Sequence, residues 1–146
     1  GGIRVPAIIS WPKHLKEDVT RNQLATSIDW FPTIADLCEI PLPVTAIDGK
    51  SLSPILNSKS APGSHETFHW QTGNQNNPNW AVRQGKWKLL GNPNDTSNKA
   101  PITAKDKWYL VNLENDIGEM NNVAAENPAI VGNLLKLHHS WADQWK

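Results

Sequence analysis

Residues 66–116 contain short stretches of strand length separated by turn residues, and this pattern constrains the fold more than any other feature of the sequence. The stretches read ETFHWQ, NWAVRQGKWKLLG and KWYLVNLEND, with turn-forming Asn-Asn-Pro and Gln-Gly-Lys among them. The segments around Ala81–Arg83 and Lys86–Leu90 are close enough to pair as a hairpin that turns at Gln84 and Gly85. We therefore expect several antiparallel strands, with the polar segment Gly91–Lys107 forming a loop between two of them.

A helix is predicted to follow the strands. Asn127 and Pro128 form an N-cap and first-turn pair, the usual chemistry of a helix start. Apolar residues then recur at helical spacing and give the helix one apolar face, made of Ile130, Leu134, Leu137, Trp141 and Trp145. The adjacent His138 and His139 point about 100° apart on such a helix, so they do not share a metal, and we expect both at the surface or rim.

The first third of the chain is predicted to contain one strand and one helix. Val5–Trp11, closed by a proline, is apolar and rich in β-branched residues, which is typical of a buried strand. Asp29 can cap a helix that carries Pro32 in its first turn. Pro41 and Pro43 are expected to end that helix, because proline cannot continue the hydrogen-bond ladder.

The residues after this helix are predicted to connect two parts of the molecule. Asp48–Leu56 should form a turn and a short docking segment, and the small polar residues of Asn57–His65 mark a connection between subdomains. Cys38 shares a helical face with Ile34 and Leu37, so we expect a small buried side chain and no nucleophile.

Composition excludes several classes of protein. The chain has 146 residues and a formal net charge of +0, so it lacks the basic surface expected of a protein that binds nucleic acid or an anionic membrane. A single cysteine excludes an intrachain disulfide framework and any multi-cysteine zinc site. The only methionine is Met120, so we expect a processed or truncated piece of a longer protein.

One group of neighbouring residues is a candidate binding site. His69, Trp70 and Gln71 lie together at the end of a predicted strand, and an imidazole, an indole and an amide there could line a polar pocket for hydroxyl groups and a ring face. A histidine satisfied within the strand edge is the alternative. The chain has eight tryptophans, each of which either packs in the core and rim or stacks on a sugar ring.

Five segments, in order, resemble the C-terminal part of the sulfatase family. GGIRVPAIISWP is similar to the end of the family signature Glu-Gly-Gly-x-Arg-Val-Pro and the apolar strand after it. SIDWFPTIADLCEI resembles the Asp-x-x-Pro-Thr helix, IDGKSLSPIL the Asp-Gly-x-Ser-Leu segment, and AVRQGKWKLL the Ala-Val-Arg-x-Gly-x-Trp-Lys-Leu strand pair. LVNLENDIGEMNNVA resembles the Gly-Glu-x-x-Asn element, with Ile117 where the family usually has proline.

The resemblance implies a parent fold of the α/β, alkaline phosphatase-like class. This chain would then be α+β, with residues 1–57 ending the large domain and residues 58–146 forming a small antiparallel sheet packed on the terminal helix. The family hydrolyses sulfate esters with a formylglycine made from Cys or Ser in Cys/Ser-x-Pro-x-Arg, beside a bound calcium. In the family's order these residues precede Gly1, so the resemblance implies no catalytic residue and no metal ligand here. Ser10-Trp-Pro-Lys-His14 fails the motif at its arginine.

The resemblance also implies a partner and a site. We expect the parent to act on a sulfated small molecule or carbohydrate, with calcium bound in the parent only, and the fragment alone to be inactive. Substrate contacts are expected from His69, Trp70, Gln71 and Arg4. The family suggests a periplasmic, secreted or lysosomal location, and the truncated edge at Val5–Trp11 could promote self-association. The alternatives are a related phosphate or phosphonate ester hydrolase, and a noncatalytic module that binds glycans or a partner.

Overall fold

The computed structural model describes residues 3–74, 76–95, 98–103 and 105–145. The chain separates into two compact units, which we describe one at a time. The first unit comprises Thr67–Lys146 and the initial residues up to Arg4, and the second comprises Val5–Glu66. In the described part of the chain, no helix has the length and apolar character that a membrane-crossing segment requires.

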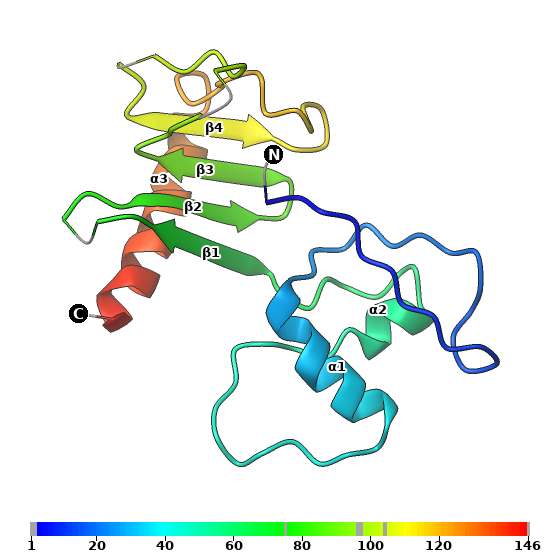
Figure 1. The fold of residues 1–146 in the computed structure, drawn as a ribbon. Coiled ribbons are helices and arrows are strands. Elements are labelled where there is room, and N and C mark those ends of the chain that lie inside the picture. Colours follow the sequence, from blue (N-terminus) through cyan, green and yellow to red (C-terminus); the bar gives the residue numbers. More distant parts are fainter. Residues whose placement is uncertain (1–2, 75, 96–97, 104, 146) are drawn as a thin grey trace. The chain divides into compact units, whose positions relative to one another are not determined.

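The first unit is built on a four-stranded antiparallel sheet in the order β1-β2-β3-β4 (Figure 1). The strands are β1 (Thr67–Thr72), β2 (Asn79–Gln84), β3 (Trp87–Gly91) and β4 (Trp108–Asn112). The predicted antiparallel strands are thus confirmed. The hairpin turn was predicted one residue too early, because Gln84 still pairs with Trp87 and the turn is therefore made by Gly85 and Lys86.

Helix α3 (Pro128–Ala142) lies along one face of this sheet and is followed by the short helix η2 (Asp143–Trp145) (Figure 1). Leu134 is 1% exposed and packs against a row of fully buried strand residues, Val82, Leu89 and Leu110. These three are paired across β2, β3 and β4, so they share one face of the sheet. The α+β class predicted for the chain is confirmed.

The outer edge of β4 is covered by the segment that follows it. The Asn122 side chain accepts hydrogen bonds from the backbone nitrogens of Leu110 (3.0 Å) and Ala124 (3.1 Å) and donates to the carbonyl oxygen of Trp108 (3.0 Å). Val123 N donates to the carbonyl oxygen of Leu110 at 3.0 Å. The unpaired backbone groups of an edge strand can pair with a strand of another molecule. The contacts of Asn122 and Val123 satisfy several of these groups on β4.

The second unit contains the short helices η1 (Ser27–Asp29), α1 (Trp30–Leu37) and α2 (Ser53–Asn57). Asp29 occupies the predicted N-cap position of α1, but its side chain makes no cap hydrogen bond to that helix. It instead completes the capping box of η1, whose N-cap is Thr26, by accepting from Thr26 N. Helix α1 ends before the two prolines, because Glu39 takes a positive φ of 56° and Ile40 N then donates to the Ala35 carbonyl at 2.8 Å.

The strand predicted at Val5–Trp11 is wrong. These residues adopt no strand and are mostly exposed, with Val5 75% and Ile8 91% accessible. A strand requires a hydrogen-bonded neighbour, and none of the described segments pairs with this one. The β-branched composition is therefore compatible with a strand but does not produce one here.

Candidate functional site

The predicted cluster of His69, Trp70 and Gln71 lies on β1, but the strand does not bring the three side chains together. Successive residues of a strand point to opposite faces of the sheet. His69 is paired with Val82, which faces α3, whereas Trp70 is paired with Ala81 on the other face. Gln71 lies on the face of His69 but is exposed. The three side chains therefore lie on two different faces of the sheet.

His69 and a second histidine pack into an aromatic layer between the sheet and α3. The His69 ring stacks on Trp141 with centroids 4.9 Å apart and planes at 2°. The His138 ring stacks on Trp80 at 3.8 Å and 11°. The two histidine rings are 6.0 Å apart, and the Nδ1 atom of each is buried with no hydrogen-bond partner. Such a layer favours neutral imidazoles, because the described residues place no acidic group among those that shift either ring.

Both imidazoles bind protons weakly. Burial lowers the pKa of His69. Burial, helped by the nearby charges of His69 and His139, lowers the pKa of His138 to about 4. Removing a cationic form from water without a partner is unfavourable, which explains the direction of both shifts. These two groups are therefore uncharged near neutral pH.

The placement of His138 corrects the sequence prediction, which put it at the surface or rim. His138 is 4% exposed. It lies four residues after Leu134 and three residues before Trp141, so it occupies the apolar face of the helix. The spacing of His138 from Leu134 and Trp141 in the sequence already indicates this buried position.

The face of the sheet opposite α3 carries aromatic and basic side chains. The rings of Phe68 and Trp70 lie 4.8 Å apart on β1. Arg83 is paired with Phe68, so its side chain shares that face. Burial lowers the pKa of Arg83, and the charge of Arg4 lowers it further. Two of the predicted substrate contacts, Trp70 and Arg4, are thus both associated with this face.

A largely buried ion pair also stabilises this face. Lys88 Nζ lies 2.8 Å and 2.7 Å from the two carboxylate oxygens of Glu119, and the side chains are 7% and 12% exposed. Burial raises the pKa of Glu119, but the hydrogen bond and charge of Lys88 outweigh it, so the pKa is lowered on balance. The Tyr109 hydroxyl donates to the Glu119 carbonyl at 3.1 Å. This ion pair joins the lysine of the Arg-x-Gly-x-Trp-Lys motif to the glutamate of the Gly-Glu motif.

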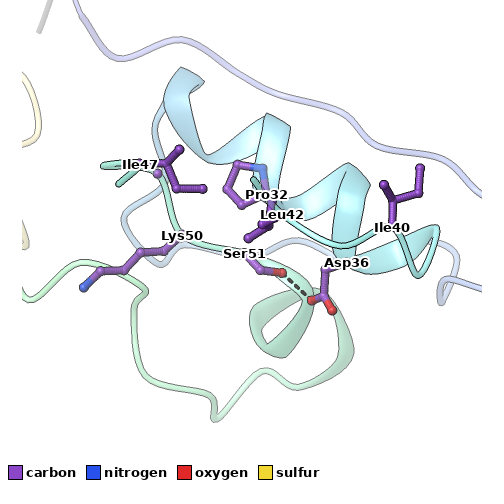
Figure 2. A pocket seen from close by; sticks show the side chains of 8 residues that line it. Pro32, Asp36, Ile40, Leu42, Ile47, Lys50 and Ser51 are labelled. Atoms are coloured by element: carbon purple, nitrogen blue, oxygen red, sulfur yellow. Dashed lines mark hydrogen bonds between the residues drawn. The ribbon is translucent and has the colours of Figure 1, made fainter. Parts of the chain in front are cut away.

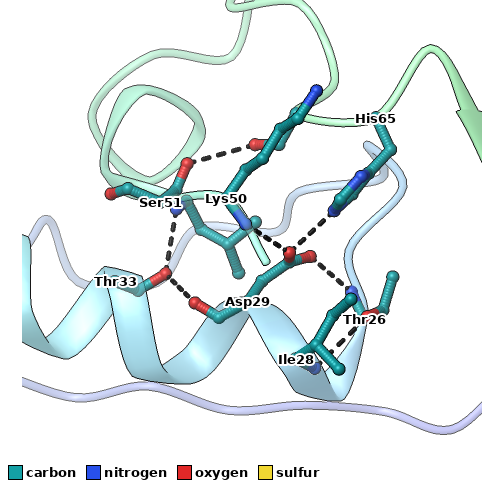
Figure 3. Close-up of polar contacts among 9 residues, drawn as sticks. Thr26, Ile28, Asp29, Thr33, Lys50, Ser51 and His65 are labelled. Carbon is teal, nitrogen blue, oxygen red and sulfur yellow. Dashed lines mark hydrogen bonds and ion pairs between the residues drawn. The ribbon is translucent and has the colours of Figure 1, made fainter. Parts of the chain in front are cut away.

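The second unit contains a buried carboxylate with several hydrogen-bond donors around it (Figure 3). Asp29 is fully buried, and its Oδ1 lies 2.7 Å from His65 Nε2 and accepts from Lys50 N at 2.9 Å. Its Oδ2 accepts from Thr26 N at 2.8 Å. A buried carboxylate is tolerated only when it is bonded in this way. Asp29 therefore joins the start of the helical segment to two later parts of the chain.

Thr33 extends this network to the Asp-Gly-x-Ser-Leu segment. Its hydroxyl donates to the Asp29 carbonyl at 2.6 Å and accepts from Leu52 N at 2.9 Å (Figure 3). Gly49 packs directly against the backbone of Ile28. A Cβ at position 49 would lie 2.0 Å from the Ile28 carbonyl oxygen, so a larger residue does not fit. The Asp-x-x-Pro-Thr and Asp-Gly-x-Ser-Leu motifs are therefore two halves of one structural contact. Reasoning from the sequence treated them separately.

A shallow groove of about 470 Å³ lies beside α1 (Figure 2). Its walls are mostly apolar, and Ser51 donates to the Asp36 carboxylate at 2.5 Å at one side. The lining residues are Pro32, Asp36, Ile40, Leu42, Ile47, Gly49, Lys50 and Ser51. The lining contains no cysteine or histidine, and the Ser51 hydroxyl is held by the Asp36 carboxylate, so we assign the groove no catalytic role.

The described residues offer no catalytic or metal centre. They include no group of three or more His, Cys, Asp or Glu side chains able to hold a metal ion. The sequence has no Cys/Ser-x-Pro-x-Arg motif. Cys38 was expected to be buried, but it is exposed, because the helical face that carries it is not covered in this chain.

Comparison with known proteins gives a consistent result. Residues 1–140 match the family model described as N-sulphoglucosamine sulphohydrolase, C-terminal. Human Arylsulfatase A is 33% identical over 153 residues, which cover 94% of this chain and 30% of that protein. N-acetylglucosamine-6-O-sulfatase of Bacteroides thetaiotaomicron is 26% identical and covers 98% of this chain and 25% of its own length.

The fold matches solved structures as well. The crystal structure of Ps i-CgsB aligns with a TM-score of 0.69 at 24% identity, covering 90% of this chain and 27% of that one. The first curated relatives are matched over only 24% to 30% of their length. The family model covers nearly the whole chain. The chain belongs to the sulfatase family, as a C-terminal portion of the kind found in N-sulphoglucosamine sulphohydrolase.

Proposed function

We propose that the protein to which this chain belongs hydrolyses the sulfate esters of a carbohydrate, and that residues 1–146 support this reaction without catalysing it. The observation that carries the proposal is the match of residues 1–140 to a sulfatase C-terminal model in a sequence that lacks the nucleophile motif. The carbohydrate part is supported by the relative named N-acetylglucosamine-6-O-sulfatase.

We propose that the two units serve different parts of the parent enzyme. Residues 1–57 would end the large catalytic domain, and residues 58–146 would include the small domain. The compact unit that holds the sheet begins at Thr67. The residues just before Thr67 still contact the preceding unit, because His65 is hydrogen-bonded to Asp29. On this basis we would move the boundary from residue 58 to Thr67.

We propose that the substrate contacts of this chain come from the sheet face opposite α3. Trp70 offers an aromatic ring beside Phe68, and Arg4 is an exposed cation near Arg83. An indole and a guanidinium suit a sugar ring and its anionic substituent. Gln71 lies on the α3 face instead, where its exposed amide would be a separate contact. His69 would contribute indirectly, by packing against Trp141.

The calcium implied by the family would be held outside this chain. The described residues contain no cluster of carboxylates of the kind calcium requires. Calcium and formylglycine would supply charge stabilisation and the nucleophile in the parent enzyme. Residues of this chain would orient the substrate and exclude water from its remote end.

The comparisons do not favour either alternative. The family model and the relatives reported above are named as sulfatases, which favours neither a phosphate or phosphonate ester hydrolase nor a noncatalytic glycan-binding module. Trp70 is half-buried, so the indole proposed to contact the sugar would present only part of its ring.

A chimera tests the proposal. The segment of human Arylsulfatase A that aligns with this chain is replaced by residues 1–146, and turnover of 4-nitrophenyl sulfate and of a sulfated N-acetylglucosamine is measured. We expect the chimera to hydrolyse both esters. Trp70→Ala should raise KM for the sugar about tenfold with little effect on the aryl ester. A folded chimera without sulfatase activity would contradict the proposed function, and equal effects of Trp70→Ala on both esters would contradict the proposed contacts.

A further inference from the structure

Three asparagines are hydrogen-bonded to one another at the end of the sheet where β1 ends, β2 begins and β3 ends (Figure 1). The Nδ2 atom of Asn92 donates to Asn77 Oδ1 at 2.7 Å and to the Pro78 carbonyl oxygen at 2.9 Å. The Nδ2 atom of Asn79 donates to the Asn92 carbonyl oxygen. We call Asn77, Asn79 and Asn92 the asparagine rim.

The backbone at Asn92 allows this contact. Strand β3 ends where Gly91 pairs with Trp80, and the next register position places Asn92 opposite Asn79. Asn92 has a positive φ of 50°, a conformation that asparagine adopts more readily than most residues. Its side chain can then bond to residues just before β2. Asn92 therefore joins the end of β3 to the turn that precedes β2.

The hydrogen bonds fix which way each amide of the rim is oriented. Backbone carbonyl oxygens only accept, so Asn92 and Asn79 must each turn their Nδ2 atom towards the carbonyl they contact. Asn77 must then turn its Oδ1 atom towards Asn92. Within the described part of the chain, Asn77 Nδ2 and Asn79 Oδ1 have no hydrogen-bond partner. The rim thus offers one free donor and one free acceptor.

The rim adjoins the aromatic part of the proposed substrate surface. Asn79 pairs with Thr72 and Trp70 pairs with Ala81, so Asn79 and Trp70 lie on the same face of the sheet. They are diagonal neighbours on adjacent strands, which are about 7 to 8 Å apart and within reach of long side chains. A sugar ring on Trp70 would therefore bring its substituents close to the rim.

The surroundings of the rim carry no formal charge. Residues 67–82 contain no Lys, Arg, Asp or Glu, and neither do residues 91–94. A sulfate group only accepts hydrogen bonds and is bound best by cations, so it does not match Asn79 Oδ1. A hydroxyl or acetamido group both donates and accepts, and it matches the free donor and the free acceptor together.

We propose that the asparagine rim binds an uncharged hydroxyl or acetamido group of the substrate's sugar ring, and that Asn92 is the residue that positions the rim. This inference rests on the function proposed above. Trp70 contacts the face of the ring, and the rim contacts one of its polar substituents. The rim therefore selects for the sugar and not for the sulfate ester.

Substitution of Asn92 in the chimera described above tests the positioning. Asn92→Asp and Asn92→Gly both tolerate a positive φ, but both lose the Nδ2 donor. We expect the KM for sulfated N-acetylglucosamine, divided by the KM for 4-nitrophenyl sulfate, to rise about fivefold in each, with kcat for the sugar changed less than about twofold. Asn98→Asp is the matched control, because Asn98 is also exposed and has a positive φ of 55°. A KM ratio that rises no more than in this control would overturn the proposal.

Substitution of Asn77 separates recognition from positioning. Asn77→Asp keeps an oxygen that can accept from Asn92 and loses only the free donor. The KM ratio should again rise about fivefold, while circular dichroism shows an unchanged unfolding midpoint. An unchanged ratio in a folded Asn77→Asp chimera would show that the rim does not contact the sugar.

The rim and the proposed function can fail separately. A chimera that hydrolyses both esters with equal KM ratios in Asn92→Asp and Asn98→Asp would retain the function and refute the rim. A folded chimera that hydrolyses neither ester would refute the function, and calorimetric titration with sulfated N-acetylglucosamine then tests the rim by itself. A dissociation constant about fivefold higher in Asn92→Asp than in Asn98→Asp would support the rim. Equal constants, or no measurable binding, would refute it.

Discussion

Acidification should destabilise the first unit through His138. The folded structure lowers the pKa of this imidazole from 6.5 to about 4, so folding favours the neutral form. The stabilisation is complete above pH 6.5 and is lost as the pH falls from 6.5 towards about 4. The unfolded chain binds the proton more tightly than the folded chain, so protonation of His138 favours unfolding. It lowers the free energy of unfolding by roughly 2 kcal/mol at about pH 5, and by roughly 3 kcal/mol at most below the folded pKa.

The assay is urea unfolding followed by circular dichroism at about pH 7.5 and about pH 5, on the wild type and His138→Phe. The aromatic substitution keeps a ring against Trp80 and removes the titration. Other groups titrate too, including His69 and Glu119, so the difference between the two proteins isolates His138. His139→Gln, at an exposed position, is the control. An identical pH dependence in the wild type and His138→Phe would refute this reasoning.

The other predictions concern stability. Gly91→Ala should lower the free energy of unfolding by roughly 2 kcal/mol or more, because the new Cβ would lie 2.0 Å from the Trp80 ring. Gly132→Ala, with nothing within 4 Å, should instead be neutral or stabilising by up to about 1 kcal/mol. Urea unfolding of the two variants measures both changes. Equal changes in the free energy of unfolding would contradict the close packing of Gly91 against Trp80. Glu119→Ala should cost roughly 3 kcal/mol by leaving Lys88 buried and unpaired, and Lys88→Met in the same chain should recover much of it; a double-mutant cycle without recovery would refute the pairing. Asp29→Ala should abolish the amide protection of Lys50 in hydrogen exchange, and retained protection would show that the network is not needed.

The fold of the first unit could be predicted largely from local signals. The turn residues around Gly85 and the helix start at Asn127 and Pro128 each act within a few residues, so they are visible in the sequence. Val5–Trp11 shows the limit of such signals, because pairing between strands depends on a distant partner.

The candidate site was less predictable than the fold. Alternation along β1 was enough to separate His69 from Trp70, but which face of the strand meets α3 depends on the tertiary packing. The contacts from Asp29 to Lys50 and from Lys88 to Glu119 join residues far apart in the chain. The family motifs identified the members of these contacts, and only the structure showed their pairing.

The most direct test of the central claim is a sulfatase assay on residues 1–146 alone, with 4-nitrophenyl sulfate in the presence and absence of calcium. The account predicts no turnover above a heat-denatured control, because the chain lacks the nucleophile motif and its described residues hold no metal site. Calcium-dependent turnover by the purified chain, above all turnover that Ser10→Ala or Cys38→Ala abolishes, would contradict the claim that the catalytic groups lie outside it.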